Sequence, residues 1–495
     1  MIQNFEVLLT SDETLMSAYH GNEFLGFGTC APPNFVPGWL YRSLFFPPMR
    51  TVDGLPVEAP YGLRKIEAQL LKEGFNVATV SPRNLTRFLR FAKVLCIYTM
   101  DPFGFGPAST TLASILGKPP YSAQYFERLL NSQAVKQVQK RGVKTIVGGP
   151  GAWQLFLRPG YLEKNDVDCV VVGEAEKVIG KVVNAALLGK PLSQRIDVNP
   201  DETPGLEEIP DIVHASVNGL VEIGRGCCRH CEFCDVTLRP LRWYPEDKVL
   251  REVHVNQAAG VRACCFHAED VMLYGSVNTR PREDKLVKLH EHVVKDVEGF
   301  SWSHCSLAAV ASSPSVLTKV SELIRQFQPW WGAEVGIETG SIRLAEKIMP
   351  AKAHPFKAKD WPSVVREGMG LMHDNFLVPA CTLIVGLPEE REEDLVATMD
   401  LVDDLKHVRS LIVPLFFVPL GLLRNEDWFK RKALLQRHKE LLFQCAEHDF
   451  YWLNDLINWA FKDKWYLTLL RPFYKAFTDI VKQKARKTES RQLST

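Results

Sequence analysis

Three closely spaced cysteines, Cys227, Cys231 and Cys234, have the residue type and the spacing to bind a metal centre. They occur in the segment GRGCCRHCEFCD as the pattern C-x3-C-x2-C, on a loop that follows a predicted strand. Three thiolates from one loop can ligate three irons of a cubane cluster, which leaves the fourth iron without a protein ligand. A metal with an open coordination position can bind and activate a cofactor or substrate. The spacing therefore predicts a 4Fe–4S cluster.

A structural zinc site is the alternative, with Cys228 or His230 as the fourth ligand. Structural zinc usually pairs two knuckles from separate chain segments, and the sequence shows no second knuckle downstream. A ferredoxin-type cluster would need a fourth cysteine at ferredoxin spacing. We expect most of the remaining cysteines to be small buried apolar residues, as this residue type usually is; these are Cys30, Cys96, Cys169, Cys305, Cys381 and Cys445.

Composition limits the class of protein. The 495 residues are 46% hydrophobic, enough for two or three domains with cores of their own. The 59 Lys and Arg residues balance 58 Asp and Glu residues, so nothing in the charge favours a nucleic-acid partner. The first residues lack the pattern of a signal peptide, and the longest apolar run, 411–423, is too short to span a bilayer. We expect a cytoplasmic protein without a transmembrane segment.

The N-terminal part has an α/β rhythm from Tyr61 onward, whereas residues 1–60 show no clean period. Short β-rich runs alternate with helical stretches, of which 125–142 is one. This alternation is typical of a parallel sheet covered on both faces. We therefore expect a doubly wound α/β domain over residues 1–195. The polar, proline-containing stretch 196–218 is expected to be a linker.

The rhythm restarts at Gly219 and predicts a second α/β domain over residues 219–425. Six probable strands are separated mostly by helical segments, which suggests a complete or partial (β/α) barrel with its chemistry at the carboxyl ends of the strands. Residues 426–495 are expected to form a helical region with a disordered tail. The aromatic stretch 449–477 is expected to pack on its own domain, with membrane-surface or substrate docking as the alternative.

The cysteine motif, placed after the first strand of a barrel-like domain, resembles the radical SAM superfamily. That resemblance implies that S-adenosylmethionine (SAM) chelates the fourth iron and is cleaved reductively to a 5′-deoxyadenosyl radical. Downstream segments match family motifs: HAED (267–270), GIETGS (336–341), and TLIVGLPEE, which resembles the family's adenine-contacting motif. Ile384, Gly386 and Glu390 match that motif, and its first glycine is replaced by Thr382. The SAM-binding residues so implied are Phe233, Glu269, Asp270, Ser306, Glu338, Ile384 and Gly386.

Three glycine-bearing segments follow strands in the N-terminal part: DPFGFGPASTT, VGGPGA and VGEAE. Glycines beyond parallel strands let the backbone approach a ligand, although tight turns alone would also explain them. In context they resemble the cobalamin-binding domain of many radical SAM proteins. The D-x-H-x-x-G motif is absent and His20 is the only histidine before residue 200, so the resemblance implies a corrinoid without histidine ligation. The implied cobalamin-binding residues are Asp101, Gly104, Gly106, Ser109, Thr110, Thr111, Gly148, Gly149, Pro150, Gly173 and Glu174.

The resemblance implies a cobalamin-dependent radical SAM methyltransferase. Such an enzyme methylates an unactivated sp3 carbon through the 5′-deoxyadenosyl radical and methylcobalamin. A ferredoxin- or flavodoxin-like protein would donate electrons, and the substrate would be a peptide or protein, a lipid or a small molecule, with a slight preference for the first. A cobalamin radical SAM enzyme that rearranges or cyclises its substrate is the first alternative. A non-catalytic iron–sulfur or corrinoid sensor is the second. No general base is evident in the sequence.

Overall fold

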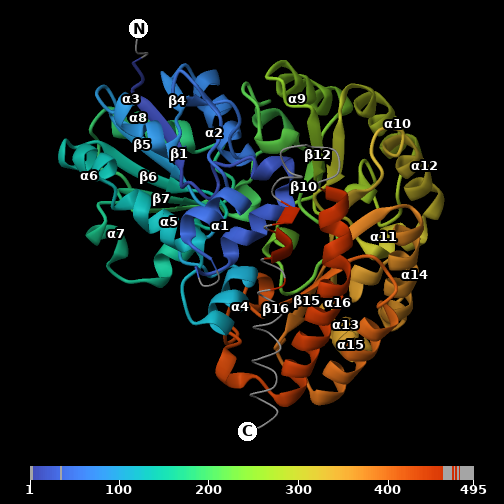
Figure 1. Cartoon of the computed structure of the whole chain (residues 1–495). Coiled ribbons are helices and arrows are strands. Elements are labelled where there is room, and N and C mark those ends of the chain that lie inside the picture. Colours follow the sequence, from blue (N-terminus) through green and yellow to red (C-terminus); the bar gives the residue numbers. More distant parts are fainter. Residues whose placement is uncertain (1–3, 34–35, 461–470, 473, 477–478, 480–495) are drawn as a thin grey trace. The chain divides into compact units, whose positions relative to one another are not determined.

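The computed structural model describes residues 4–33, 36–460, 471–472, 474–476 and 479 (Figure 1). The chain divides into two compact units. The first comprises residues 1–33, 41–221 and 244–264, and the second comprises 34–40, 222–243 and 265–495. The tail that was expected to be disordered and most of the second half of the aromatic stretch lie outside the described residues.

The first unit is built on a six-stranded parallel sheet with the strand order β4-β1-β5-β6-β7-β8. Strand β1 lies inside the sheet although residues 1–60 gave no pattern. All five of its residues are buried, so it has no polar–apolar alternation to detect. Strand β8 falls at the edge of the predicted linker and extends the sheet. The strands are β1 (Val7–Ser11), β4 (Val77–Thr79), β5 (Val94–Tyr98), β6 (Lys144–Gly148), β7 (Cys169–Val172) and β8 (Arg195–Asp197).

Helices cover both faces of this sheet, which confirms the predicted doubly wound fold. Helices α2 (Tyr61–Lys72) and α8 (Ile179–Leu187) pack on one face, against Val7 and Leu9 of β1. The opposite face, with Leu8, packs against α3 (Leu85–Phe88), α5 (Tyr121–Leu130), α6 (Gln133–Lys140) and α7 (Tyr161–Lys164). The single helix expected over 125–142 is two helices. It breaks at Ser132, whose side chain accepts a hydrogen bond from the Val135 amide and so begins α6.

Buried ion pairs join α2 to residues 209–216 and to helix α9 (Glu246–Ala258) within the first unit. The side chains of Arg64 and Glu67 are each only 3% exposed and lie 2.8 Å apart, and His214 Nδ1 lies 3.0 Å from the same carboxylate. Lys65 pairs with Glu252 of α9 and also donates to the Pro210 carbonyl at 2.7 Å. A buried charge that lost its partner here would be strongly destabilising.

The Glu67 network predicts an acid-sensitive contribution to folding. Burial alone would raise the pKa of Glu67, but the hydrogen bond from His214 and the Arg64 charge lower that pKa to about 2. Because this pKa is lower in the folded chain than its usual value of 4.5, the ionised carboxylate stabilises the fold above about pH 4.5. That contribution to the free energy of unfolding, about 3 kcal/mol, is lost as the pH falls towards 2. Urea unfolding between pH 7 and pH 3 measures it. We expect Glu67→Gln to be less stable at pH 7, with that deficit narrowing towards pH 3; a deficit independent of pH would contradict the assignment.

The second unit and its adjoining residues carry six strands arranged as two three-stranded sheets, β13-β12-β9 and β14-β15-β16. A parallel bridge between His304 and Glu334 continues the first sheet into the second, which gives the expected partial barrel. The strands are β9 (Leu220–Glu222), β12 (Ala263–His267), β13 (Gly299–Trp302), β14 (Trp331–Glu338), β15 (Leu377–Val385) and β16 (Leu411–Phe416). The intervening helices are α10 (Glu283–Val293), α11 (Leu307–Ser312), α12 (Pro314–Ile324), α13 (Ile342–Ile348), α14 (Trp361–Asp374) and α15 (Glu392–Asp404).

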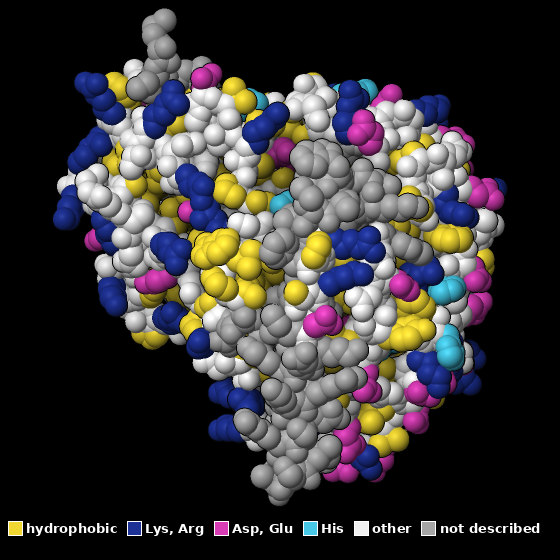
Figure 2. All heavy atoms as spheres, in the orientation of Figure 1, with side chains coloured by type: hydrophobic (Ala, Val, Ile, Leu, Met, Phe, Trp, Pro, Cys, Tyr) yellow, Lys and Arg dark blue, Asp and Glu magenta, His cyan; other side chains and the backbone are white. Residues whose placement is uncertain are grey.

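The described C-terminal region is helical, as expected. Helix α16 (Gln436–Ala460) packs against β16, where the Ile412 amide donates to Asp449 at 2.6 Å. Leu456 is buried in a cluster with Val378 and Leu411, so this part of the aromatic stretch does pack on its own unit. Within the described ranges, no helix combines the length and apolarity needed to cross a bilayer. On the face of the molecule shown in Figure 2, Lys and Arg side chains form separate groups rather than one continuous basic patch.

Candidate functional site

The cysteine loop lies between β10 (Gly224–Arg225) and a short 3-10 helix, η8 (Asp235–Leu238). Cys231 is 5% exposed, while Cys227 and Cys234 are half-buried. The segment after β16 supports this loop, because the Leu422 amide donates to the Glu232 carbonyl at 2.7 Å. Gly421, with φ +59°, allows this approach: a Cβ there would lie 2.5 Å from the Glu232 carbonyl oxygen.

The three cysteine thiols fit an iron–sulfur cluster, whose positively charged irons can replace their protons. Burial raises the pKa of all three thiols, that of Cys234 to about 11, so iron must displace their protons when it binds. Lys352 and Arg229 counteract this effect at Cys231, because both cations favour its thiolate. Among the described residues, no group of three or more His, Cys, Asp or Glu side chains converges on the position of one ion. A cubane cluster does not need such convergence, since each thiolate ligates a different iron.

Arg229, inside the cysteine motif, connects the loop to two of the predicted SAM contacts. Its buried guanidinium donates to Asp270 at 2.9 Å and to Ser306 at 2.6 Å, and it also donates to the Lys352 and His354 carbonyls. Ser306, which begins α11, donates to the same Asp270 carboxylate at 2.5 Å. The structure thus brings Asp270 and Ser306 together beside the cysteine loop. The sequence analysis missed Arg229, and its place between two motif cysteines was the available signal.

Glu338 ends β14 in a left-handed conformation, with φ +65°. One carboxylate oxygen accepts from Lys352 at 2.9 Å and the other accepts from the Thr382 hydroxyl at 3.2 Å. Gly336 makes room for this arrangement, because a Cβ there would lie 1.9 Å from the Glu338 oxygen. Thr382, which departs from the family motif, therefore orients a predicted SAM contact. Phe233, Glu269 and Ile384 are half-buried, which leaves each with accessible surface.

Two histidines at the carboxyl ends of β12 and β13 supply acid–base groups that the sequence analysis did not identify. His304 Nε2 lies 3.2 Å from the Glu334 carboxylate, and both side chains are more than a third exposed. The His267 ring centroid lies 6.0 Å from that of His304. Burial lowers the pKa of His267, which favours its neutral form. A neutral imidazole oriented by a carboxylate is a group that can accept a proton.

In the first unit, the loop after β5 carries several of the predicted cobalamin contacts. The chain passes from β4 to β5 across β1, so the strand order reverses between β1 and β5. Ligands of open α/β sheets bind outside the carboxyl ends of strands at such a point. Asp101 holds this loop in place by accepting from the Gly106 amide at 2.9 Å and from Gln154 at 2.8 Å.

Buried hydroxyls at this edge fit a ligand with polar side chains. Ser109 and Thr110, in α4 (Pro107–Leu116), each have a buried hydroxyl oxygen for which the described part of the chain offers no hydrogen-bond partner. Thr111 instead donates to the Pro107 carbonyl at 2.7 Å. An unpaired buried hydroxyl is costly, so a ligand that bonds to it would gain affinity.

The predicted glycines have structural reasons of their own. A Cβ on Gly149 would lie 2.4 Å from the Thr99 carbonyl oxygen, and a Cβ on Gly173 would lie 2.6 Å from that of Val198. Both glycines also have φ above +100°. The tight-turn explanation thus accounts for these two positions. A Cβ on Gly104 would lie 2.5 Å from the Pro120 side chain, whereas the nearest atom to a Cβ on Gly148 would be 3.7 Å away.

The loop after β1 belongs to the same edge and was not predicted. Asp12 is buried there, and burial raises its pKa to about 6. Its carboxylate accepts from the amide of Thr14 at 2.8 Å and from its hydroxyl at 2.5 Å. No motif marks this loop, since the strand before it has no detectable period.

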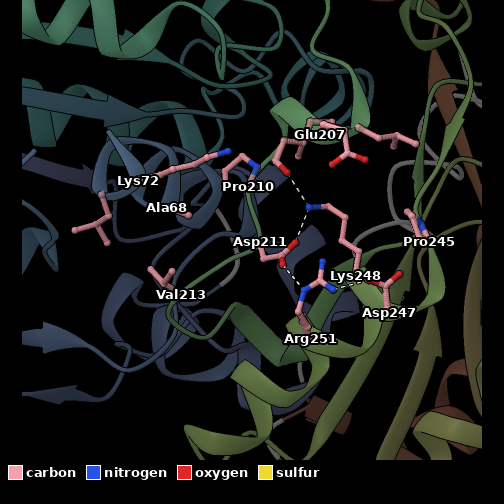
Figure 3. Close-up of a pocket in the computed structure, with 13 residues that line it drawn as sticks. Ala68, Lys72, Glu207, Pro210, Asp211, Val213, Pro245, Asp247, Lys248 and Arg251 are labelled. Carbon is pink, nitrogen blue, oxygen red and sulfur yellow. Dashed lines mark hydrogen bonds and ion pairs between the residues drawn. The ribbon is translucent and has the colours of Figure 1, made fainter. Parts of the chain in front are cut away.

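A surface pocket of about 600 Å³ lies elsewhere in the first unit, between α2, residues 206–213 and the start of α9 (Figure 3). Lys248 and Arg251 both point towards Asp211, at 2.5 and 2.6 Å, and Arg251 also pairs with Asp247 at 2.6 Å, so two cations here meet two carboxylates. None of the predicted site residues lines this pocket. It is therefore separate from the predicted cofactor sites.

Comparison with protein families identifies the domain that holds the cysteine loop. Residues 221–402 match the model of the Radical SAM superfamily, which confirms the predicted radical SAM domain. The match agrees with the prediction of a 4Fe–4S cluster and SAM as its cofactors.

Curated relatives include two tRNA-2-methylthio-N(6)-dimethylallyladenosine synthases. The relative from Vesicomyosocius okutanii subsp. Calyptogena okutanii is 24% identical over 252 residues, which are 49% of this chain and 53% of the relative. The relative from Thermotoga petrophila is 25% identical over 283 residues, which are 54% of this chain and 58% of the relative. The chain thus spans about half the length of these curated relatives.

Two solved structures share the fold over most of the chain. Both are of the radical S-adenosylmethionine methyltransferase TsrM from Kitasatospora setae. One has cobalamin and a 4Fe–4S cluster bound; it has a TM-score of 0.55 at 13% identity and covers 85% of this chain and 77% of its own. The other has tryptophan substrate and a SAM analog bound; it has a TM-score of 0.53 at 13% identity and covers 82% of this chain and 72% of its own. At this identity the likeness shows the fold.

Proposed function

We propose that this chain is a cobalamin-dependent radical SAM methyltransferase that methylates an unactivated sp3 carbon, in a peptide or protein substrate. The observation that carries the proposal is the cysteine loop joined by Arg229 to Asp270 and Ser306, within residues that match the Radical SAM superfamily. The doubly wound unit supports the cobalamin part, because the buried hydroxyls of Ser109 and Thr110 have no hydrogen-bond partner among the described residues. The shared fold of TsrM, of which one solved structure holds cobalamin, supports it further.

The roles of the chain's own residues follow from their contacts. Cys227, Cys231 and Cys234 would hold the cluster, and Lys352 and Arg229 would balance its negative charge. Glu338, held by Lys352 and Thr382, would accept hydrogen bonds from the SAM ribose. Once reduced by an external electron donor, the bound cluster would supply the electron for the reductive cleavage of SAM, and bound cobalamin would supply a carrier for the methyl group. The protein contributes by positioning these groups and excluding water from them.

Product analysis tests the proposal. The protein would be purified without oxygen, reconstituted with iron, sulfide and cobalamin, reduced with dithionite and supplied with SAM. We expect about four irons and one cobalt per chain, with formation of both 5′-deoxyadenosine and S-adenosylhomocysteine. 5′-Deoxyadenosine without S-adenosylhomocysteine would favour a rearrangement or cyclisation. Bound cofactors without any SAM cleavage would favour a sensor, and zinc in place of iron would contradict the proposal altogether.

A further inference from the structure

The segment that follows β16 lies outside the matched domain, yet it packs on the predicted adenine contact. Gly386 comes directly after β15 and has φ +81°. A Cβ on Gly386 would lie 2.0 Å from Cδ2 and 2.1 Å from Cγ of Phe429. Only a glycine therefore allows the Phe429 ring to lie against the backbone at this point. The absent side chain is replaced by an aromatic surface from 43 residues further along the chain.

The Phe429 ring is held by aromatic neighbours on two sides. Its centroid lies 5.3 Å from that of Phe416, nearly perpendicular to it, and 5.1 Å from that of His438. The Phe429 amide also donates to the Phe417 carbonyl at 3.3 Å, while the Phe417 amide donates to the Val385 carbonyl at 2.9 Å. These contacts tie the ring to the end of β15 and fix its orientation.

One carboxylate oxygen of Glu390 links Gly386 to His438, both of which contact the Phe429 ring. Its Oε2 accepts from the Gly386 amide at 2.8 Å and lies 2.8 Å from His438 Nε2. The Leu435 amide donates to His438 Nδ1 at 2.9 Å, so Nε2 carries the proton and donates to Glu390. The side chains of Glu390 and His438 are at most 7% exposed. Glu390 thus fixes the Gly386 turn and anchors the start of α16.

Phe429 itself is only half-buried, so part of its ring is accessible beside the end of β15. Ile384, the other predicted adenine contact on this strand, is also half-buried. Adenine is a flat aromatic base, and bases stack on rigid aromatic side chains with little regard to sequence context. We propose that Phe429 forms a wall of the adenine site and stacks on the base, with His438 and Glu390 as positioning residues. This inference rests on the SAM binding that the proposed function requires.

Binding measurements on the reconstituted protein, made without oxygen, test this wall. Phe429→Ala should weaken the affinity for SAM and for 5′-deoxyadenosine by about tenfold, the usual order for loss of a base-stacking ring. Methionine, which lacks adenine, should bind as it does to the wild type. Phe429→Leu keeps an apolar side chain without the ring, so its affinities for SAM and 5′-deoxyadenosine should lie between those of the wild type and of Phe429→Ala. Tyr451→Ala removes a 70% exposed aromatic from α16 and is the matched control, expected to leave all three affinities unchanged.

A positioning role for His438 predicts a rescue. His438→Ala should weaken 5′-deoxyadenosine binding, whereas His438→Gln keeps an N–H donor for Glu390 and should recover part of the affinity. Iron content and the unfolding midpoint of each variant would show whether it is folded and loaded.

The outcomes separate this inference from the proposed function. If the wild type binds neither SAM nor 5′-deoxyadenosine, both fail together. If the wild type binds both and the folded Phe429→Ala variant binds them equally well or more tightly, only the adenine wall is wrong.

Discussion

Replacing Cys231 with alanine is expected to abolish the cluster band in the visible spectrum and to reduce the rate of 5′-deoxyadenosine formation by more than about a hundredfold. Changes to groups that merely orient metal ligands already cost about 10- to 100-fold, so loss of a ligand should exceed that range. Cys231 is the most buried of the three thiols, which leaves little room for water or an added thiol to replace it. Iron analysis and product quantification by liquid chromatography measure the two effects.

The chain supplies a matched control for this variant in the adjacent Cys228. It is a half-buried thiol on the same loop, but it lies outside the C-x3-C-x2-C spacing. Cys228→Ala should therefore keep its iron and its SAM cleavage. A zinc site with Cys228 as its fourth ligand predicts instead that Cys228→Ala loses its metal, and one with His230 predicts zinc rather than iron in the wild type. A Cys228→Ala variant that loses its metal, beside a Cys231→Ala variant that keeps iron, would overturn the cluster assignment.

The contrast between cysteines and cations shows what a sequence can predict here. The three cysteines lie within eight positions on one loop, so their spacing alone was enough to predict a cluster site. Lys352 acts on Glu338 and on Cys231, which is 121 positions earlier in the chain. No local pattern marks such a residue, because the contact exists only once β14 and the segment after α13 have folded.

In the N-terminal unit, too, the sequence predicts features that have a local pattern and misses those that depend on long-range packing. Its alternating helices and short apolar runs were enough to predict the doubly wound sheet, because each element has a local pattern. Strand β1 was missed because burial on both faces leaves it without alternation. The glycine-bearing segments could be recognised in the sequence, where cobalamin binding and tight turns were both open explanations. Their cause at Gly149, a carbonyl oxygen 2.4 Å from where a Cβ would lie, depends on how two distant loops cross.

Arg229→Met should lower the free energy of unfolding by about 3–5 kcal/mol, because it leaves the Asp270 carboxylate buried without its cation. The two side chains are 4% and 5% exposed and lie 2.9 Å apart, so water cannot compensate for the loss. Methionine keeps much of the arginine volume, which separates the charge effect from a cavity effect. Urea unfolding followed by tryptophan fluorescence measures the change, since Trp302, Trp331 and Trp361 are buried in the same unit.

If burial of the Arg229–Asp270 pair causes this loss of stability, an exposed ion pair should contribute much less. A second pair in the same unit tests this expectation. Arg282 and Asp284 lie 2.6 Å apart but are 45% and 60% exposed. Exposed pairs contribute about 0–1 kcal/mol, so Arg282→Met should change little. Adding Asp270→Asn to Arg229→Met should recover stability, because a neutral amide is less costly to bury than an unpaired carboxylate. Equal effects of the two arginine variants, or no recovery in the double variant, would show that Arg229 does not stabilise the site by pairing with Asp270.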